Sequence, residues 1–357
     1  MAAHGFSHTE KRTINKLVLD NDDAKVPPPQ CEHGPAVRFR RITKAADGSV
    51  QDSRDFYACS AIRDRKICPL FCWVDEYERH AENSAKRLRT SGPEREYDKT
   101  NNKANAQYFF SGEAVGVIKR YVAKHGYHRV LCLGTPVVYR TLSDSKDNVD
   151  TFLLDMDPVV VQKAESSGAR FNMVNGYFFD DAGKDRNEGW LRSGGVDIVV
   201  VDPPFQPELV PAIWRSLRSL LGSDAFSKVD VLFAFPYFSR DALQESPCAP
   251  KLFMNEYRVD YANHKTYKAD RSPVRFFTRL HELTNLPSSS YKVCKKCGGK
   301  WVHNSNVHCD LCGGCMTIHG AKAWEHCSRC GKCTKPGLKH CDNCTICLPV
   351  GHQCRSC

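Results

Sequence analysis

The chain has 357 residues, 41% of them hydrophobic, and a net charge of +10, which suits one large domain with one or two small ones. No stretch approaches the roughly 18 apolar residues that cross a bilayer, and the first residues contain no apolar segment typical of a secretory signal. Composition therefore argues against membrane and secreted proteins, and we expect a protein of the nucleus or the cytoplasm.

The cysteines point to metal. Thirteen of the 19 cysteines fall in residues 291–357, together with ten lysines and arginines and three acidic residues. In a reducing compartment such a cluster indicates zinc sites in preference to disulfides. The basic balance suggests a polyanion partner such as nucleic acid. Zinc held by three thiolates and one histidine carries a net negative charge, however, so charge alone is a weak argument.

Residues 28–75 contain a candidate zinc site. A C-x-H pair, Cys31 and His33, is followed by Cys59 at the end of RDFYAC and by Cys68 at the start of CPLFCW. Zinc prefers four sulfur or nitrogen ligands in a tetrahedron, which these residues supply. The pattern resembles the GRF-type zinc finger, and the resemblance implies these four residues as ligands and leaves Cys72 unligated.

The role of this finger stays open between a structural zinc and direct contact with nucleic acid. Nearby cations favour contact, although they could equally form a solvated face: Arg38, Arg40, Arg41, Arg63, Arg65 and Lys66. The following residues, 76–103, are polar and charged with little apolar periodicity. They predict a linker, or a helix followed by a loop.

Residues 104–285 alternate strand-like and helix-like stretches. The segments RVLCLG, FLLD, VDIVVVD and KVDVLFAF are short apolar runs, which are typical of parallel strands buried on both faces. Helical stretches such as GEAVGVIKRYVAK separate them. The pattern predicts an α/β domain, doubly wound and Rossmann-like, with its ligands at the carboxyl ends of the strands.

Two strand ends suggest a nucleoside site. The first strand ends at Gly134 and Thr135, where a small residue lets a ligand approach the backbone, and the second ends at Asp155. An acidic residue there can accept both ribose hydroxyls. Asp157 is a competing candidate for that role, and a turn with a helix cap would explain the same residues. No G-x-G-x-x-G is present, so the dinucleotide fingerprint is absent.

The sequence VDPPF at 201–205 is the strongest indication of a functional site. Asp202 sits at a strand end, Pro203 and Pro204 make a stiff turn whose carbonyls can accept, and Phe205 offers a flat apolar face. This corner suits a planar amine, such as that of adenine, held by the Asp202 carboxylate and the Pro203 carbonyl. Such bonds would aim the nitrogen lone pair at an electrophile. A simple strand break remains the structural alternative.

The D-P-P-F tetrapeptide also matches the motif of class I S-adenosylmethionine-dependent amino methyltransferases. The segments NAQYFF, GTP, LLDMD, NMVNGYFFD, VDPPF, FAFPYF and SPVRFF follow in order over nearly the whole chain. Together they resemble the eukaryotic large-subunit rRNA adenine-N6 methyltransferases of the CCHC-zinc-finger type. The resemblance implies S-adenosylmethionine as cofactor, an unpaired or flipped-out adenosine in RNA as substrate, and a location in the nucleus, nucleolus and cytoplasm.

The same resemblance implies roles for particular residues. The catalytic corner would be Asp202, Pro203, Pro204 and Phe205. The cofactor would contact Gln107, Tyr108, Phe109 and Phe110 as a lid, with Gly134, Thr135, Pro136, Asp155, Met173, Val174 and Asp202. A basic loop over the substrate entrance would present Lys265, Lys268, Arg271 and Arg275, although a solvated surface loop is the alternative.

The sequence departs from that family, because it lacks a C2H2 finger before the catalytic domain and a final CCHC knuckle. Substrate choice could therefore differ. Two alternatives stay open: a zinc-rich nucleic-acid-binding scaffold with an inactive methyltransferase fold, or an amino methyltransferase acting on DNA adenine or protein glutamine.

Residues 291–357 repeat the unit H-C-x2-C-x2-C three times. Pairing each inner cysteine pair with the next outer residues predicts interleaved sites, which resemble those of DHHC-type domains without the DHHC tetrad. Such a segment has too few apolar residues to fold without metal. The four predicted sites are Cys294, Cys297, His308 and Cys315; Cys309, Cys312, His326 and Cys333; Cys327, Cys330, His340 and Cys347; and Cys341, Cys344, His352 with Cys354 or Cys357.

Overall fold

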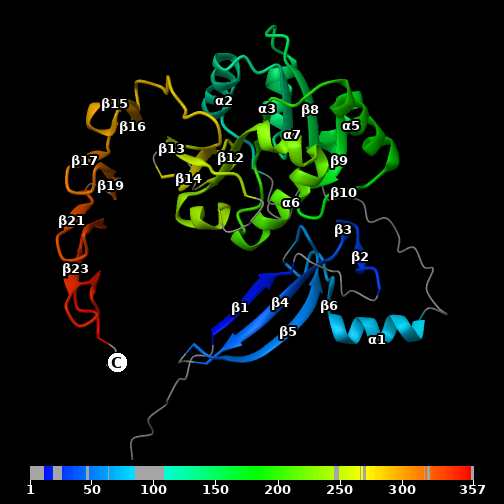
Figure 1. The fold of residues 1–357 in the computed structure, drawn as a ribbon, viewed down its shortest axis with the longest axis horizontal. Helices are drawn as coiled ribbons and strands as arrows, with labels where there is room; N and C mark the ends of the chain where they lie inside the picture. Colours follow the sequence, from blue (N-terminus) through cyan, green and yellow to red (C-terminus); the bar gives the residue numbers. More distant parts are fainter. Residues whose placement is uncertain are drawn as a thin grey trace, which may run out of the picture.

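The computed structural model describes residues 12–18, 26–45, 48–62, 64–84, 108–244, 249–265, 267, 271–316, 318–319 and 322–354. They form an N-terminal finger, a central α/β domain and a C-terminal series of hairpins, in chain order (Figure 1). No helix among these residues is long and apolar enough to span a membrane.

The N-terminal finger is built on an antiparallel sheet of order β1-β4-β5-β6. Its strands are β1 (Arg12–Leu17), β4 (Val37–Lys44), β5 (Val50–Ala58) and β6 (Phe71–Trp73). A small hairpin, β2 (Gln30–Cys31) and β3 (Gly34–Pro35), carries the C-x-H pair. Since β1 pairs with β4, the finger begins before residue 28, where the sequence analysis placed its start. Helix α1 (Val74–Ser84) follows β6 directly and overlaps the start of residues 76–103, for which the sequence predicted a linker, or a helix followed by a loop.

The central sheet has eight strands in the order β10-β9-β8-β7-β11-β12-β14-β13. Strands β9, β8, β7, β11 and β12 are mutually parallel, and four of them, β8, β7, β11 and β12, correspond to the apolar runs predicted as parallel strands. Strands β14 and β13 close one edge as an antiparallel pair, and β10 pairs antiparallel with β9 at the other. The bounds are β7 (Arg129–Leu133), β8 (Asp150–Asp155), β9 (Gly168–Asn172), β10 (Tyr177–Phe178), β11 (Ile198–Val201), β12 (Asp230–Pro236), β13 (Phe253–Arg258) and β14 (Val274–Thr278).

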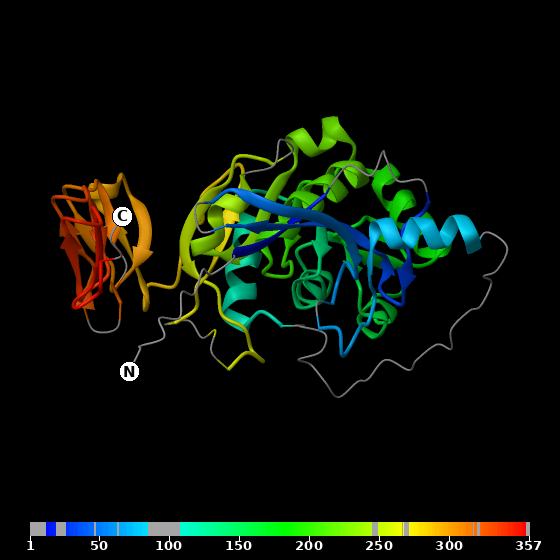
Figure 2. The same cartoon turned by 90° about the horizontal axis from the view of Figure 1, so that it is seen from below.

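Helices cover both faces of this sheet (Figures 1 and 2). Alternate residues of one strand enter different cores: Leu131 and Leu133 join a core that includes Trp214, whereas Val130 and Cys132 join a core that includes Ile118. Burial on both faces explains the continuous apolar runs. The helices are α2 (Gly112–Lys124), α3 (Pro136–Ser143), α4 (Pro158–Gln162), α5 (Asp181–Ser193), α6 (Val210–Leu221) and α7 (Ser223–Lys228), with 3-10 turns at Glu165–Ser167, Pro207–Leu209, Tyr237–Leu243 and Lys295–Cys297.

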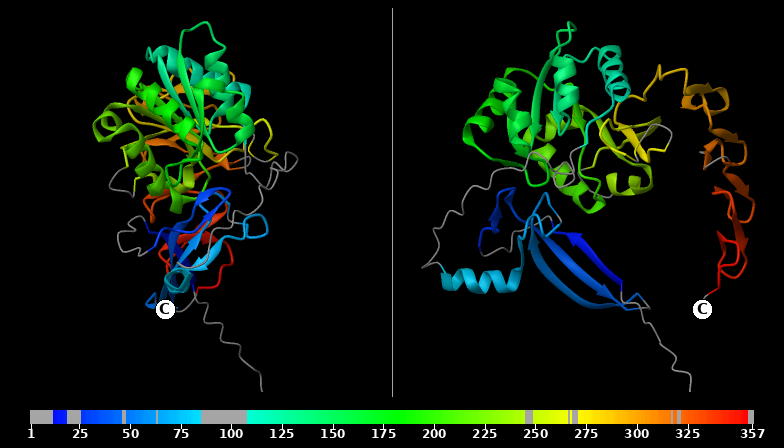
Figure 3. Two further views of the ribbon diagram at one scale, coloured as in Figure 1. Left: turned by 90° about the vertical axis from the view of Figure 1, so that its right-hand side faces the viewer. Right: turned by 180° about the vertical axis from the view of Figure 1, so that it is seen from behind.

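The C-terminal part is a single file of short hairpins (Figures 1 and 3). The first hairpin docks on the central domain, since Tyr291 is buried and its hydroxyl accepts the Arg258 N–H at 2.9 Å. The strands are β15 (Tyr291–Cys294), β16 (Lys300–His303), β17 (Val307–Cys309), β18 (Gly314–Met316), β19 (Ile318–His319), β20 (Lys322–Ala323), β21 (Glu325–Cys327), β22 (Lys332–Thr334), β23 (Leu338–Cys341) and β24 (Ile346–Pro349).

A buried carboxylate ties the first residue of β12 to its surroundings. Asp230 is fully buried, and its Oδ2 accepts hydrogen bonds from the hydroxyls of Tyr121 at 2.6 Å and Tyr127 at 2.8 Å. Its Oδ1 accepts the N–H groups of Val231 and Leu280 at 2.8 and 2.9 Å. The carboxylate thereby joins α2, β12 and the segment after β14.

We predict that Asp230→Ala lowers the free energy of unfolding by about 3 kcal/mol or more, because several buried donors lose their acceptor together. Denaturant unfolding followed by circular dichroism measures the loss. The matched control is Asp224→Ala in exposed helix α7, for which we expect a change within about 0.5 kcal/mol. Equal stabilities of the two variants would contradict the role given to Asp230.

Candidate active site and metal centres

The D-P-P-F corner leaves the sheet at the carboxyl end of β11. The Asp202 N–H still donates to the carbonyl of Leu133 on the neighbouring strand at 3.2 Å, so the acidic residue is placed by the sheet itself. Beyond it the chain turns sharply, because the Gln206 N–H donates to the Pro204 carbonyl at 2.8 Å. The corner therefore has a defined geometry beside the ends of β7 and β8.

A cavity of about 360 Å³ opens at this corner. Its walls come from several strand ends of the central domain and from the N-terminal finger. The lining residues are His33, Ala61, Ile62, Tyr108, Gly134, Asp155, Met156, Asp157, Asn172, Met173, Val174, Asp202, Pro203, Pro204, Phe205, Gln206 and Tyr261. The structure thus brings Gly134, Asp155 and the whole D-P-P-F corner to one cavity.

Gly134 lines the cavity at a position where a side chain would collide with its neighbours. Its φ is +68°, a conformation that favours glycine, and its N–H donates to the Leu154 carbonyl at 2.8 Å. A Cβ at this position would lie 2.9 Å from both the Asp202 carbonyl oxygen and Met173 Cε. The bare backbone is therefore required for the approach of the β7 and β11 ends.

The two candidate ribose acceptors have different roles. Asp157 caps helix α4, because its side chain accepts the Val159 N–H at 2.8 Å. Asp155 lies at the end of β8, 7% exposed, with Oδ1 accepting the Asp157 N–H at 2.9 Å. Burial raises the pKa of the Asp155 carboxyl to about 7, partly opposed by that hydrogen bond. Asp155 is the better placed acceptor for ligand hydroxyls.

Asp202 has one specific partner in the cavity. Its Oδ1 accepts a hydrogen bond from the Tyr261 hydroxyl at 2.8 Å. Burial raises the pKa of the Asp202 carboxyl well above its usual range; the Tyr261 hydroxyl opposes the shift and Asp155 adds to it. Burial and the neighbouring Asp202 also raise the pKa of Tyr261, which therefore stays protonated as a donor. A cation bound beside Asp202 would favour its ionised form.

Aromatic rings surround the corner. The Phe205 ring centroid lies 5.9 Å from that of Phe235 in an edge-to-face arrangement, and 6.3 Å from that of Tyr267 at 34°. Tyr108 meets the ring of His264 at 4.5 Å. A planar ring entering this cavity would find flat apolar surfaces on Phe205 and its neighbours.

The described residues of the predicted lid segment lie in different environments. Tyr108 lines the cavity, but Phe110 is 4% exposed and packs in the core, where its ring lies 5.3 Å from that of Tyr261. Phe109 uses its backbone, whose N–H donates to Asn263 Oδ1 at 2.9 Å and whose carbonyl accepts the Ala262 N–H at 2.8 Å. Gln107 lies outside the described residues. The lid prediction was wrong for Phe110, since its bulk fills the core.

Two further predicted cofactor contacts, Thr135 and Pro136, do not line the cavity. Thr135 is 2% exposed, and its hydroxyl donates to the Val200 carbonyl of β11 at 3.4 Å. Pro136 is the first residue of helix α3. Met173 and Val174 do line the cavity, on the turn between β9 and β10.

The predicted basic loop is only partly a loop. Lys265 and Arg271 are exposed, and Lys268 lies outside the described residues. Arg275 contradicts the prediction, because it lies within β14, is 4% exposed and donates to the carbonyls of Ser272 and Val274 at 2.8 and 2.9 Å. A buried strand residue of this kind is not available to RNA. The apolar stretch SPVRFF was the signal that could have shown it.

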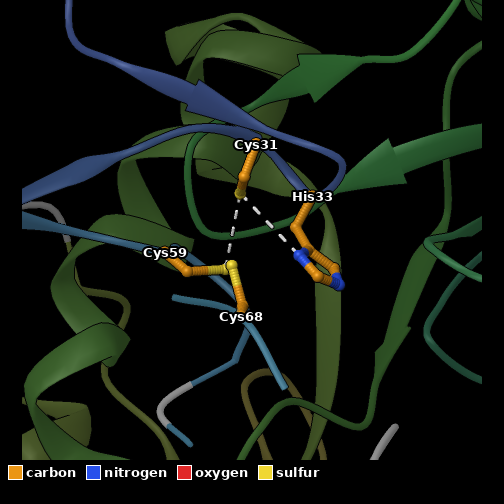
Figure 4. A group of neighbouring side chains, drawn as sticks. All are labelled: Cys31, His33, Cys59 and Cys68. Carbon is orange, nitrogen blue, oxygen red and sulfur yellow. Dashed lines mark hydrogen bonds between the residues drawn. The ribbon is translucent and has the colours of Figure 1, made fainter. Parts of the chain in front are cut away.

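The N-terminal finger brings its four predicted ligands together. Cys31, His33, Cys59 and Cys68 offer ligand atoms that all lie within 4.8 Å of one another (Figure 4). Cys31 Sγ lies 3.7 Å from His33 Nδ1 and 3.8 Å from Cys59 Sγ. Three thiolates and one imidazole at such distances suit tetrahedral zinc. Cys72 lies on β6 outside the cluster.

The C-terminal hairpins bring together four more clusters, in the interleaved pairing that the repeat predicts. They are Cys294, Cys297, His308 and Cys315; Cys309, Cys312, His326 and Cys333; Cys327, Cys330, His340 and Cys347; and Cys341, Cys344, His352 and Cys354. Cys354 takes the last position, and Cys357 lies outside the described residues. The first three clusters each join two hairpins, and the last joins β23 to the residues after β24, so metal would hold the file together.

Several residues were not predicted from the sequence to line the cavity. Tyr261 lies in VDYANHKTYK, where cations drew attention and the tyrosine did not. Gln206 has a buried Oε1 without a hydrogen-bond partner. His33, Ala61 and Ile62 belong to the finger, 140 to 169 positions before Asp202, a separation at which no spacing rule operates. Only the tertiary structure places them.

The family model and the similar proteins both describe N6 methylation of adenine or adenosine. A family model described as "Probable N6-adenine methyltransferase" matches residues 101–267. The rRNA N6-adenosine-methyltransferase ZCCHC4 of Homo sapiens is 30% identical over 86% of this chain and 74% of its own length. The Mus musculus protein of the same name is 29% identical over 79% of this chain and 70% of its own length.

Solved structures give weaker likenesses. A TehB-like SAM-dependent methyltransferase from Corynebacterium glutamicum is 13% identical, covers 57% of this chain and 96% of its own, and has a TM-score of 0.29. The T. thermophilus 16S rRNA N2 G1207 methyltransferase RsmC, in complex with AdoMet and guanosine, is 12% identical over 59% of this chain and 46% of its own, with a TM-score of 0.24.

We predict that binding of S-adenosylhomocysteine weakens at low pH. Below the Asp155 pKa of about 7, the carboxyl of the ligand-free protein is protonated and is a poorer acceptor for ribose hydroxyls. Isothermal titration calorimetry should give a dissociation constant about tenfold higher at about pH 6 than at about pH 8. Asp155→Asn should bind weakly with a shallower pH dependence, whereas Asp157→Asn, which keeps the helix cap, should retain the wild-type profile. An unchanged profile in Asp155→Asn would contradict the assignment.

We also predict five zinc ions per chain, one for each cluster. Mass spectrometry of the metal content measures this number directly. Cys344→Ser should remove one zinc from the last cluster and leave the other four, because that cluster joins only the final residues to β23. Fewer than four zinc ions in this variant would show that the sites are not independent.

Proposed function

The chain belongs to the rRNA N6-adenosine-methyltransferase family, and we propose that it transfers a methyl group from S-adenosylmethionine to N6 of an adenosine in large-subunit ribosomal RNA. One observation carries this proposal: the Asp202 carboxyl, the bare backbone of Gly134 and the buried Asp155 carboxyl share one cavity. Asp202 supplies an acceptor for the amine, Gly134 lets a ligand approach the backbone, and Asp155 supplies an acceptor for the ribose hydroxyls. All three lie at the carboxyl ends of strands, where this fold binds its ligands.

The residues of the cavity fit the cofactor. Asp155 offers carboxylate oxygens for the two ribose hydroxyls, and Met173 and Val174 offer apolar surface for the adenine ring. Gly134 exposes its backbone to the cavity and lets the ends of β7 and β11 lie close together. When bound, S-adenosylmethionine supplies a methyl group on a sulfonium, which is already a strong electrophile.

Asp202 would hold the target amine. Tyr261 occupies its Oδ1, which fixes the carboxyl orientation and leaves Oδ2 for an N–H of the substrate. The Pro203 carbonyl is the second acceptor in the proposal, and Phe205 stacks on the base. Two such bonds orient the nitrogen lone pair, so the chain contributes by positioning and by excluding water.

Methyl transfer to the amine needs no strong general base. When the cofactor is bound, the amine would take its methyl group, S-adenosylhomocysteine would be released, and the cationic amine would then lose a proton. An ionised Asp202 stabilises that positive charge and can accept the proton, which fits its place beside the amine. Its raised pKa in the ligand-free protein fits a group that gains its charge only beside a cation.

An adenosine must leave its base stack to reach this corner, because Asp202 and Phe205 lie within a cavity of the domain. We therefore propose an unpaired or flipped-out adenosine in RNA as the target. The exposed Lys265 and Arg271 and the zinc modules support RNA as the partner, because phosphate contacts position nucleic acids. A nuclear and nucleolar location, with some protein in the cytoplasm, follows from this substrate as part of the proposal.

The test is methyl transfer from labelled S-adenosylmethionine to separate pools of RNA, DNA and protein. We expect label in RNA, as N6-methyladenosine by nucleoside mass spectrometry, and a loss of about a hundredfold or more in Asp202→Ala. Asp181→Asn, an exposed position on α5, is the matched control and should keep full activity.

Other outcomes would redirect the proposal. Label confined to DNA or protein would keep the chemistry and replace the substrate. Label in no pool, from protein with its full zinc content, would contradict the enzymatic function. Unchanged activity in Asp202→Ala would contradict the role of the corner.

A further inference from the structure

We propose that the N-terminal zinc finger forms part of the cofactor site, and that Asn172 is the positioning residue through which metal in the finger strengthens cofactor binding. The inference rests on the proposed function, because it takes the cavity at the D-P-P-F corner as the cofactor pocket. It predicts that two ligands bound to different parts of the chain stabilise each other.

The side-chain amide of Asn172 bonds to the finger through its nitrogen and to the turn that lines the cavity through its oxygen. It is the last residue of β9 and is fully buried. Its Nδ2 donates to the His33 carbonyl at 2.9 Å and to Ser60 Oγ at 2.6 Å, both in the finger. Its Oδ1 accepts the Val174 N–H at 3.0 Å, which shapes the turn that lines the cavity.

Neighbouring contacts hold the finger close to this turn. Asn175 Nδ2 donates to the Pro35 carbonyl at 2.8 Å. Gly34 lies against Tyr177 so tightly that a Cβ would meet the ring at 2.8 Å. The hairpin that carries Cys31 and His33 therefore sits directly on the β9–β10 turn.

The metal ligands also shape the cavity wall. Cys59 Sγ accepts the N–H groups of Ala61 at 3.4 Å and Ile62 at 3.2 Å, and both residues line the cavity. His33, which lines the cavity as well, offers its ring to the metal cluster (Figure 4). A metal that fixes Cys59 and His33 therefore fixes three residues of the wall.

Coupling through these contacts is reciprocal. If zinc in the finger orders the wall and thereby raises affinity for the cofactor, the cofactor must retain that zinc by the same factor. We expect a factor of about ten, within the usual range for two sites that share packed contacts. The C-terminal clusters do not line this cavity and provide an internal comparison.

The experiment uses the full chain and measures two quantities: the dissociation constant of S-adenosylhomocysteine by calorimetry, and zinc content by mass spectrometry. Cys59→Ser should lose one zinc and bind about tenfold more weakly. Cys344→Ser is the matched control, and should lose one zinc and bind like the wild type. Thermal unfolding of the α/β domain should be cooperative in every variant.

Asn172→Asp removes the contact with the finger and leaves the metal ligands unchanged, so it separates the effect of the contact from that of the metal. The new carboxylate keeps the acceptor for Val174 but removes the donors toward the finger, so this variant should retain all its zinc and still bind about tenfold more weakly. Its affinity should not fall further when Cys59→Ser is added, because both changes break the same link. In the wild type, S-adenosylhomocysteine should slow the release of one zinc to a chelator, and in Asn172→Asp it should not.

Equal dissociation constants for wild type and Cys59→Ser would overturn the coupling while the proposed function stands. Weaker binding in Cys59→Ser with normal binding in Asn172→Asp would overturn the role of Asn172. A wild-type protein that does not bind S-adenosylhomocysteine would overturn both this inference and the proposed function.

Discussion

The constraint on which the site depends is the placement of a carboxyl group at the end of a fully buried parallel strand. Residues of β11 are buried on both faces, and the backbone of Asp202 still bonds to β7, so the sheet sets the position of its backbone. Two prolines then prevent the chain from continuing the strand. A polar group in such a position is costly unless it is bonded, and Tyr261 supplies the bond.

Around this carboxyl, three parts of the chain contribute to one cavity. The strand ends of the α/β domain provide Gly134, Asp155 and Asp202, the antiparallel edge leads to Tyr261, and the finger provides the remaining wall. The zinc modules therefore differ in what they do. The finger lines the cavity of the α/β domain, whereas beyond its first hairpin the C-terminal part is a file of hairpins whose Cys/His clusters could hold metal (Figures 1 and 3).

Local signals predicted much of this arrangement. Apolar runs predicted the parallel strands, a repeated H-C-x2-C-x2-C unit predicted four metal clusters, and the D-P-P-F motif pointed to the strand end that now borders the cavity. Long-range packing was beyond such signals. Phe110 was predicted to form part of a lid although it fills the core, whereas Arg275 was assigned to a loop although its apolar neighbours were a local sign of a buried strand. The contact between Asn172 and the finger depends on residues more than a hundred positions apart, which no local pattern records.

The most direct test is a crystal structure of the full chain with S-adenosylhomocysteine bound. The ligand should lie in the cavity between Gly134 and the finger, with its ribose hydroxyls on the Asp155 carboxylate and its sulfur facing the Asp202 corner. A ligand bound elsewhere on the chain, with Asp155 and Asp202 out of contact with it, would contradict the placement of the active site.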